Sequence, residues 1–179
     1  MARGRRTEEP PTTGSASQDA DPDPERVART ILLRTLTGAP RSRHQLAEKL
    51  AQRDVPEEVA ERVLDRFTEV GLIDDAAYAA MVVRSTRESR SLGRRAVAQE
   101  LRRRGIAPED AESALADVDD EADEETARAL LVRRWPGWTA LPEEVRTRRA
   151  FGMLARKGFS GGMSSRLVRE MGEYRQTRP

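Results

Sequence analysis

Apolar residues recur three or four positions apart along most of the chain, beginning near residue 24. This is the spacing of one face of an α-helix, and Gly or Pro separates the runs. One run, with Val59, Val63 and Phe67, lies between Pro56 and Gly71, which are a typical helix start and stop. No segment alternates as a β-strand would. The pattern predicts helices that begin near residues 25, 42, 56, 75, 94, 108, 121, 142 and 160.

Three segments of the chain repeat one pattern, at residues 46–55, 97–106 and 150–159. In each, an apolar or small residue is followed four positions later by Leu, then by a basic residue, by Gly or Asp, and by an apolar residue. The three leucines are 51 and 53 residues apart, a period typical of stacked copies of one unit. We expect the middle helix of each unit to end at a fixed residue, and the next residue to fill the junction of the last two helices: Asp54, Gly105 and Gly158, followed by Val55, Ile106 and Phe159.

The expected fold is all-α. Three tandem three-helix, helix-turn-helix-like repeats, over 24–73, 74–119 and 120–179, would stack into an elongated, curved, right-angled array. Residues 1–23 contain no aliphatic side chain larger than Ala after Met1, so little there offsets the entropy of ordering, and we expect a disordered tail. An array of this kind exposes long faces, which are typical of macromolecular binding.

The net charge of +1 conceals strong segregation along the chain. Residues 84–104 carry eight arginines and two glutamates, residues 107–126 carry ten carboxylates and no base, and residues 144–179 carry nine bases and three glutamates. Charge sorted into blocks predicts a surface with opposed fields, and such fields govern association with charged partners.

The sequence lacks the residues that several kinds of catalytic and metal-binding site require. There is no cysteine and one histidine, His44, and no Gly-rich phosphate loop ends in Lys and Ser or Thr. The pair Asp74 and Asp75 lies at a predicted helix start, where capping explains it. We therefore expect no catalytic residue, no metal site and no cofactor. No run resembles a signal peptide or a membrane span, so we expect a cytoplasmic protein without membrane contact. We also expect a monomer.

Two basic helices on successive units would form a stripe that follows a phosphate backbone without reading its sequence. The candidate DNA- or filament-binding residues are Arg84, Arg87, Arg90, Arg94, Arg95, Arg102, Arg103, Arg104, Arg148, Arg149, Arg156 and Lys157. On the helical pattern, Arg94, Arg95, Arg102 and Arg103 fall mostly on the outer face. The acidic segment between the two basic blocks suggests a basic partner or a salt-bridged contact between units; its candidate protein-contact residues are Asp117, Asp119, Asp120 and Glu121.

The two tryptophans of the chain, Trp135 and Trp138, flank a Pro-Gly turn that breaks the chain between two predicted helices. One interpretation is that they fill the gap between the second and third units. The other is base stacking, because a flat ring accepts any base.

The three repeated segments resemble those of one family. Residues 41–50, 63–67 and 71–79 look like the first repeat of RecX regulatory proteins, residues 93–106 resemble the second-repeat signature, and residues 149–160 resemble the third. The resemblance covers about residues 25–175. Two departures stand out: Asp54 replaces the usual Gly, and Ala76-Ala77 replaces more polar residues after the Asp pair.

The resemblance implies a crescent-shaped helical protein that lies in the groove of the RecA recombinase filament on single-stranded DNA. Such a protein inhibits the ATPase, strand-exchange and co-protease activities of RecA, and so modulates recombinational repair and the SOS response. By the same resemblance, the basic residues of the second and third units are the DNA-proximal ones. Two alternatives remain: a helix-turn-helix transcription regulator that reads one duplex operator, and a scaffold that binds a protein through its acidic strip alone.

Overall fold

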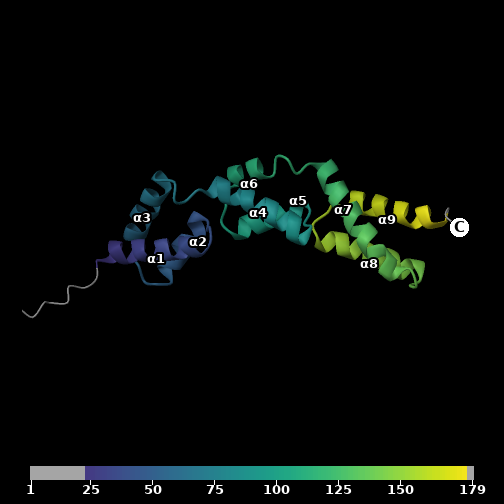
Figure 1. Cartoon of the computed structure of the whole chain (residues 1–179), viewed down its shortest axis with the longest axis horizontal. Helices are drawn as coiled ribbons and strands as arrows, with labels where there is room; N and C mark the ends of the chain where they lie inside the picture. The colour runs from purple at the N-terminus through teal and green to yellow at the C-terminus, as the bar shows by residue number, and fades with distance from the viewer. Residues whose placement is uncertain (1–22, 177–179) are drawn as a thin grey trace, which may run out of the picture.

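The structure, a computed structural model, describes residues 23–176 and the side chains of residues 23–173. All the secondary-structure elements in this part of the chain are helices (Figure 1). The elements are α1 (Pro24–Gly38), α2 (Arg43–Ala51), α3 (Glu57–Glu69), α4 (Asp75–Arg90), α5 (Arg94–Arg103), α6 (Pro108–Ala114), α7 (Asp120–Arg134), the 3₁₀ helix η1 (Trp135–Trp138), α8 (Glu143–Arg156) and α9 (Gly161–Gln176). The all-α prediction is confirmed; the disordered tail predicted for residues 1–23 lies almost wholly outside the described residues.

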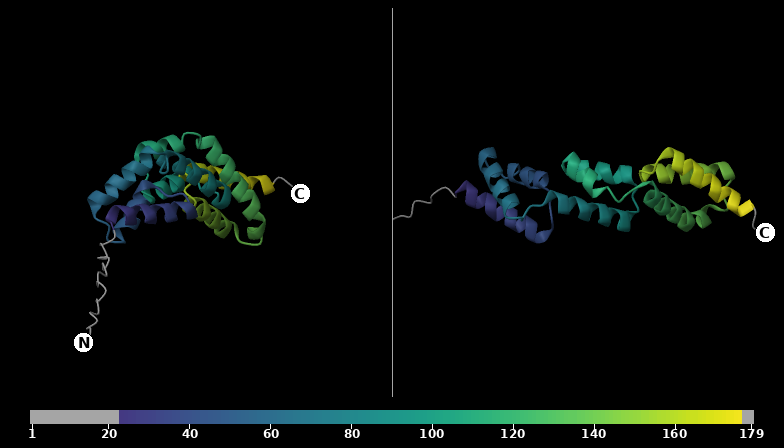
Figure 2. Two further views of the ribbon diagram at one scale, coloured as in Figure 1. Left: turned by 60° about the vertical axis from the view of Figure 1, so that its left-hand side comes forward. Right: turned by 90° about the horizontal axis from the view of Figure 1, so that it is seen from above.

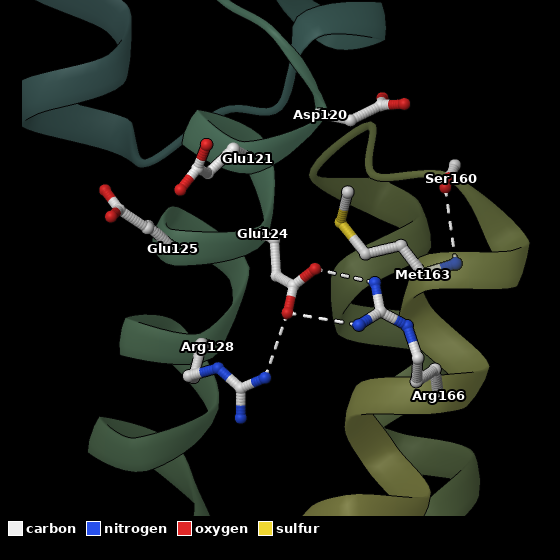
Figure 3. A pocket seen from close by; sticks show the side chains of 8 residues that line it. All are labelled: Asp120, Glu121, Glu124, Glu125, Arg128, Ser160, Met163 and Arg166. Carbon is white, nitrogen blue, oxygen red and sulfur yellow. Dashed lines mark hydrogen bonds and ion pairs between the residues drawn. The ribbon is translucent and has the colours of Figure 1, made fainter.

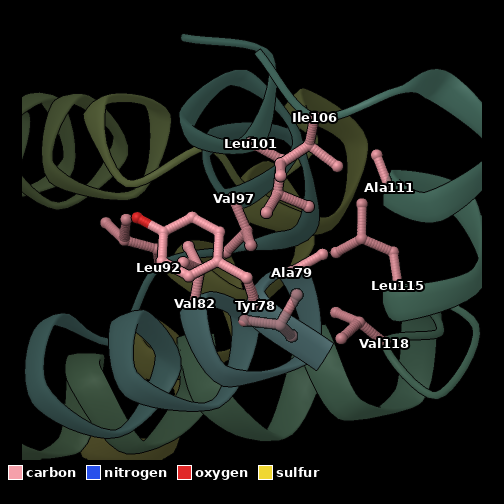
Figure 4. Close-up of a cluster of buried hydrophobic side chains, with 11 residues drawn as sticks. Tyr78, Ala79, Val82, Leu92, Val97, Leu101, Ile106, Ala111, Leu115 and Val118 are labelled. Atoms are coloured by element: carbon pink, nitrogen blue, oxygen red, sulfur yellow. The ribbon is translucent and has the colours of Figure 1, made fainter. Parts of the chain in front are cut away.

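The helices form three units in an elongated, curved row, with α1–α3 at one end, α4–α6 in the middle and α7–α9 at the other (Figures 1 and 2). Each unit has its own hydrophobic core. Leu46, Leu50 and Leu64 are fully buried in the first, Val97 and Leu101 in the second, and Leu131, Leu154 and Leu167 in the third. Figure 4 shows the second core, in which Tyr78 and Val82 of α4 face Val97 and Leu101 of α5 and Leu115 beyond α6. The predicted stacked array of three-helix units is confirmed.

The middle helix of each unit ends in the same way. Asp54, Gly105 and Gly158 adopt φ angles of 56°, 70° and 86°, in the left-handed region that stops a helix. The residue after each is buried, and its backbone N–H donates to the carbonyl of the repeated leucine five positions earlier. The N···O distance is 3.2 Å in all three cases: Val55 to Leu50, Ile106 to Leu101 and Phe159 to Leu154. The repeated sequence pattern is thus a repeated helix stop, as predicted.

Helix starts also follow the sequence signals. Ser42 and Gln45 form the predicted capping box, with hydrogen bonds of 3.2 and 3.3 Å, and the Asp74 carboxylate accepts from the N–H of Ala77 at 2.8 Å. The predicted break at the two tryptophans is the helix η1. Trp135, however, lies in the core of the third unit and is 5% exposed. The interpretation that it fills the gap between the second and third units is wrong.

Candidate nucleic-acid and protein interface

The joint between the first and second units consists of polar contacts at the start of α2. The Ser42 hydroxyl donates to the carbonyl of Arg104 at 2.5 Å, at the end of α5. The N–H of Arg43, in the first turn of α2, donates to the Asp75 carboxylate of α4 at 2.8 Å. The second unit therefore caps a helix of the first unit, and a Cβ on Gly105 would overlap the His44 side chain at this contact.

The joint between the second and third units repeats this arrangement at the start of α5. The N–H of Gly93 donates to the carbonyl of Lys157 at 2.8 Å, and the N–H of Arg94 donates to the Asp123 carboxylate of α7 at 2.9 Å. A Cβ on Gly158 would overlap the backbone nitrogen of Ala96. Both joints thus place a positive-φ glycine and a carboxylate of one unit against the first turn of the preceding unit's middle helix.

This repeated joint explains why Asp54 replaces glycine in the first unit. Gly105 and Gly158 each dock against a preceding unit, so a side chain has no room at either position. Asp54 belongs to the first unit of the row, is exposed and docks against no preceding unit. Only its backbone conformation therefore limits which residue can occupy this position. Asp is one of the few non-glycine residues that tolerate that conformation.

Three of the candidate basic residues, Arg87, Arg94 and Arg104, are half-buried and are held by contacts within the protein. The Arg87 guanidinium, 16% exposed, lies 2.7 Å from the buried Asp123 carboxylate and also donates to the carbonyls of Leu92 and Ala122. Arg94 donates to the carbonyls of Leu115 and Val118, so its expected outward position is wrong.

Arg104, the third of these residues, has a 29% exposed side chain that binds the Glu100 carboxylate at 2.7 Å and the Tyr78 hydroxyl at 2.7 Å. The hydrogen bond from Arg104 lowers the pKa of the Glu100 carboxyl. Arg103 also contacts Glu100, at 2.5 Å, but remains exposed. These contacts leave Arg87, Arg94 and Arg104 poorly placed to bind an external phosphate.

The remaining candidates lie on the surface, and several of them come together across two units. Arg84, Arg90, Arg95, Arg102, Arg103, Arg148, Arg149 and Arg156 are exposed. Arg95 of α5 and Arg156 of α8 line one hollow, and Arg156 also lines a second hollow with residues of α7 and α8. A basic surface therefore crosses the joint between the second and third units. We define it by Arg95, Arg133, Arg134, Arg148, Arg149, Arg156 and Lys157, which line the two hollows, and by Arg90, whose carbonyl accepts from the Lys157 ammonium.

Arg133 and Arg134 also belong to this surface, although they are not among the residues predicted from the sequence. They occupy the last turn of α7, where basic residues complement the helix dipole. Because this role explains two arginines at a helix end, the sequence alone does not mark them as binding residues. Only the packing of α7 beside α8 brings them to the other cations. Burial lowers the pKa of the Lys157 ammonium, and the positive charges of Arg90, Arg133 and Arg134 lower it further. The Lys157 ammonium also donates to the carbonyl of Arg90.

The acidic candidates lie around the start of α7. Asp117, Asp119, Asp120 and Glu121 are all exposed, and Asp119 caps α7 by accepting from the N–H of Ala122 at 2.8 Å. A hollow of about 570 Å³ lies between α7 and α9. Figure 3 shows the side chains that line it, with Asp120 and Glu121 at its edge.

Within this hollow, the Glu124 carboxylate binds Arg166 of α9 at 2.6 Å and Arg128 of α7 at 3.0 Å, and these hydrogen bonds lower the pKa of the Glu124 carboxyl. The acidic block is thus partly a contact between helices of the third unit and partly an exposed acidic edge.

Neither a metal-binding cluster nor a membrane-spanning helix is present among the described residues. No group of three or more His, Cys, Asp or Glu side chains in this part of the chain is arranged to hold a metal ion. Of the helices in residues 23–176, none is long and apolar enough to cross a membrane.

The fold and its surface define a class: a helical-repeat protein with a basic surface across one joint between its units, as in proteins that bind other macromolecules. Three family models of RecX match the chain in order: the first three-helix domain over residues 28–67, the second over 74–115 and the third over 121–168.

Curated relatives extend the match to most of the chain. The protein is 48% identical over 161 residues to the regulatory protein RecX of Streptomyces coelicolor, covering 89% of this chain and 86% of the relative. It is 50% identical to RecX of Thermobifida fusca (80% and 77% covered) and 41% identical to RecX of Mycolicibacterium smegmatis (93% and 92% covered). The chain therefore belongs to the RecX family of regulatory proteins, and the resemblance found in its sequence is confirmed.

Solved structures agree with this assignment. A crystal structure of a regulatory protein RecX, 31% identical, matches with a TM-score of 0.71 over 79% of this chain and 70% of that one. RecX from Lactobacillus salivarius matches with a TM-score of 0.75 over 84% and 97%, and its 22% identity makes it a comparison of fold alone.

Proposed function

We propose that the protein binds the filament of the RecA recombinase on single-stranded DNA in the cytoplasm, and inhibits its ATPase, strand-exchange and co-protease activities. In this way it limits recombinational repair and the SOS response. The observation that carries the proposal is the basic surface across the joint between the second and third units, on a curved helical array in a member of the RecX family. The exposed acidic residues from Asp117 to Glu121 lie on the same array and provide the contact to the recombinase.

An operator-binding regulator is less consistent with the helix ends. A recognition helix places its first turn against base edges in the major groove. The third helices of the first two units, α3 and α6, begin with Glu57-Glu58 and with Glu109-Asp110, which a phosphate-lined groove repels. The first turns of α2 and α5 are already occupied by the joints.

Co-sedimentation with filaments tests the proposal. The protein is mixed with filaments of the host's RecA on single-stranded DNA, or with random duplex DNA in the same buffer. We expect it to pellet with the filaments and to show no preference among duplex sequences. Absence from the filament pellet, together with tight binding of one duplex sequence, would favour the operator-binding alternative.

Removing two charges of the basic surface should weaken filament binding. Arg95→Gln/Arg156→Gln changes two exposed residues that line one hollow across the joint and that form no ion pair with other described residues. We expect about a tenfold loss of affinity for the filament, because charge-assisted contacts to phosphate are lost. The matched control is Arg26→Gln/Arg34→Gln on α1, which removes the same charge from the far end of the row. Equal binding by the two double variants would show that the basic surface does not contact the filament, as the scaffold alternative requires.

A further inference from the structure

A hollow of about 570 Å³ lies between the last turn of α7 and the outer face of α8. An apolar floor and a basic rim line it. Leu130 of the floor is buried in the core of the third unit, while Trp138 and Met153 are half-buried and pack against that core. The rim consists of Arg133, Arg134, Arg148, Arg149, Arg156 and Lys157.

The rim is a concentration of unneutralised positive charge. No carboxylate lines the hollow, and none of its six cations forms a salt bridge with another side chain of residues 23–173. Arg128 and Arg166, on the other side of the same unit, are instead paired with Glu124 and Glu170. Desolvation and the neighbouring arginines lower the pKa of Lys157, in keeping with a local excess of positive charge. A bound anion would relieve this repulsion.

The structure separates the roles of the two tryptophans. Trp135 is 5% exposed and serves the core, whereas Trp138 lines the basic hollow. Stacking on an aromatic ring holds any base, because every base has a flat π-face. An aromatic ring within a ring of arginines is therefore suited to a nucleotide with its phosphate.

We propose that this hollow binds one nucleotide of a single DNA strand, with its base against Trp138 and its phosphate between the arginines at the end of α7 and the cations of α8. The proposal deepens the proposed function, because it rests on the DNA of the filament being a ligand of the protein. Bases of a duplex are stacked on their neighbours and unavailable to Trp138, so the hollow distinguishes single strands from duplexes. An acidic peptide would use the charges but leave the ring without a role.

Fluorescence anisotropy of a dye-labelled oligothymidylate tests the proposal with two variants of the full chain. Trp138→Leu should weaken binding about tenfold, the loss expected for one stacked base, without changing the salt dependence. Arg133→Gln/Arg134→Gln should lower the slope of log affinity against log salt by about 1.4, or roughly 0.7 for each lost phosphate contact on a single strand. The control Arg26→Gln/Arg34→Gln should leave both quantities unchanged.

An abasic strand of the same length, which has the phosphates without the bases, separates stacking from folding. We expect Trp138→Leu to bind the abasic strand as the unchanged protein does. If the variant loses affinity for both strands equally, or for neither, Trp138 does not stack on a base and the proposal is wrong. Preferential binding of polyglutamate over oligothymidylate would also overturn it, in favour of an acidic protein segment.

The RecA ATPase separates this proposal from the proposed function. Normal inhibition by the unchanged protein, with binding of oligothymidylate that does not depend on Trp138, would refute the nucleotide hollow alone. Absence of inhibition, with Trp138-dependent binding, would refute the proposed function and leave the hollow as a single-strand site.

Discussion

Replacement of Asp123 by Ala is expected to lower the free energy of unfolding of the third unit by about 3–5 kcal/mol, the usual cost of leaving a buried charge without its partner. Asp123 is 6% exposed, and its carboxylate accepts from both Arg87 and the backbone N–H of Arg94. The change removes the ion pair and the cap of α5 together. The main helix–helix packing lies within units, so the joint between the second and third units depends largely on polar contacts of this kind.

Urea unfolding followed by two probes measures this effect. Both tryptophans of the chain belong to the third unit, so fluorescence reports that unit while far-UV circular dichroism reports all helices. We expect the fluorescence midpoint to fall below the dichroism midpoint, because units of a repeat protein unfold separately when their interface fails. The control Glu125→Ala, exposed on the same helix, should change stability by about 0.5 kcal/mol or less. Coincident transitions with a loss of about 1 kcal/mol or less would mean that Asp123 does not hold the joint.

Replacement of Gly158 by Ala should be the most damaging glycine substitution, with an expected cost of about 3 kcal/mol. Its φ of 86° strains an L-residue by about 1–2 kcal/mol, and the new Cβ would overlap the backbone of Ala96. Backbone cannot rotate away as a side chain can, so the joint must open, at a further cost of about 1–3 kcal/mol.

Two other glycines calibrate that prediction by thermal or urea unfolding. Gly71 has a φ of 73° but open space around it, so Gly71→Ala should cost only the backbone strain. Gly105→Ala should also cost more than Gly71→Ala, because its Cβ would overlap the Cβ of His44, which moves only with the backbone of α2. Equal losses for all three variants would show that docking of the helix ends contributes nothing beyond their φ angles.

Most of the fold within each unit is predictable from local signals. The repeated Leu, basic residue, Gly or Asp and apolar residue mark a helix stop in which backbone conformation and one buried side chain act together, and all three stops form as expected. Ser42 and Asp74 cap the helices that follow them, because capping depends on residues only three positions apart.

The contacts at the joints between units cannot be predicted from the local sequence pattern. Helical periodicity places Arg94 outside the core of its own helix, which is correct for that helix, but the carbonyls of Leu115 and Val118 cover it. The pattern likewise predicts an exposed Arg87, because its partner Asp123 lies 36 positions later in the chain, on a helix of the next unit. In the candidate site, the exposed arginines of α8 were predicted, whereas Arg133 and Arg134 join them only through the packing of α7 beside α8.

The most direct test of the proposed function is the single-stranded-DNA-dependent ATPase rate of the host's own RecA as the protein is added. We predict inhibition well below one protein per recombinase, since blocking a few positions affects a whole filament. Arg95→Gln/Arg156→Gln should require more protein for the same effect, and Arg26→Gln/Arg34→Gln should not. An unchanged ATPase rate in the presence of folded protein at stoichiometric amounts would contradict the proposed function.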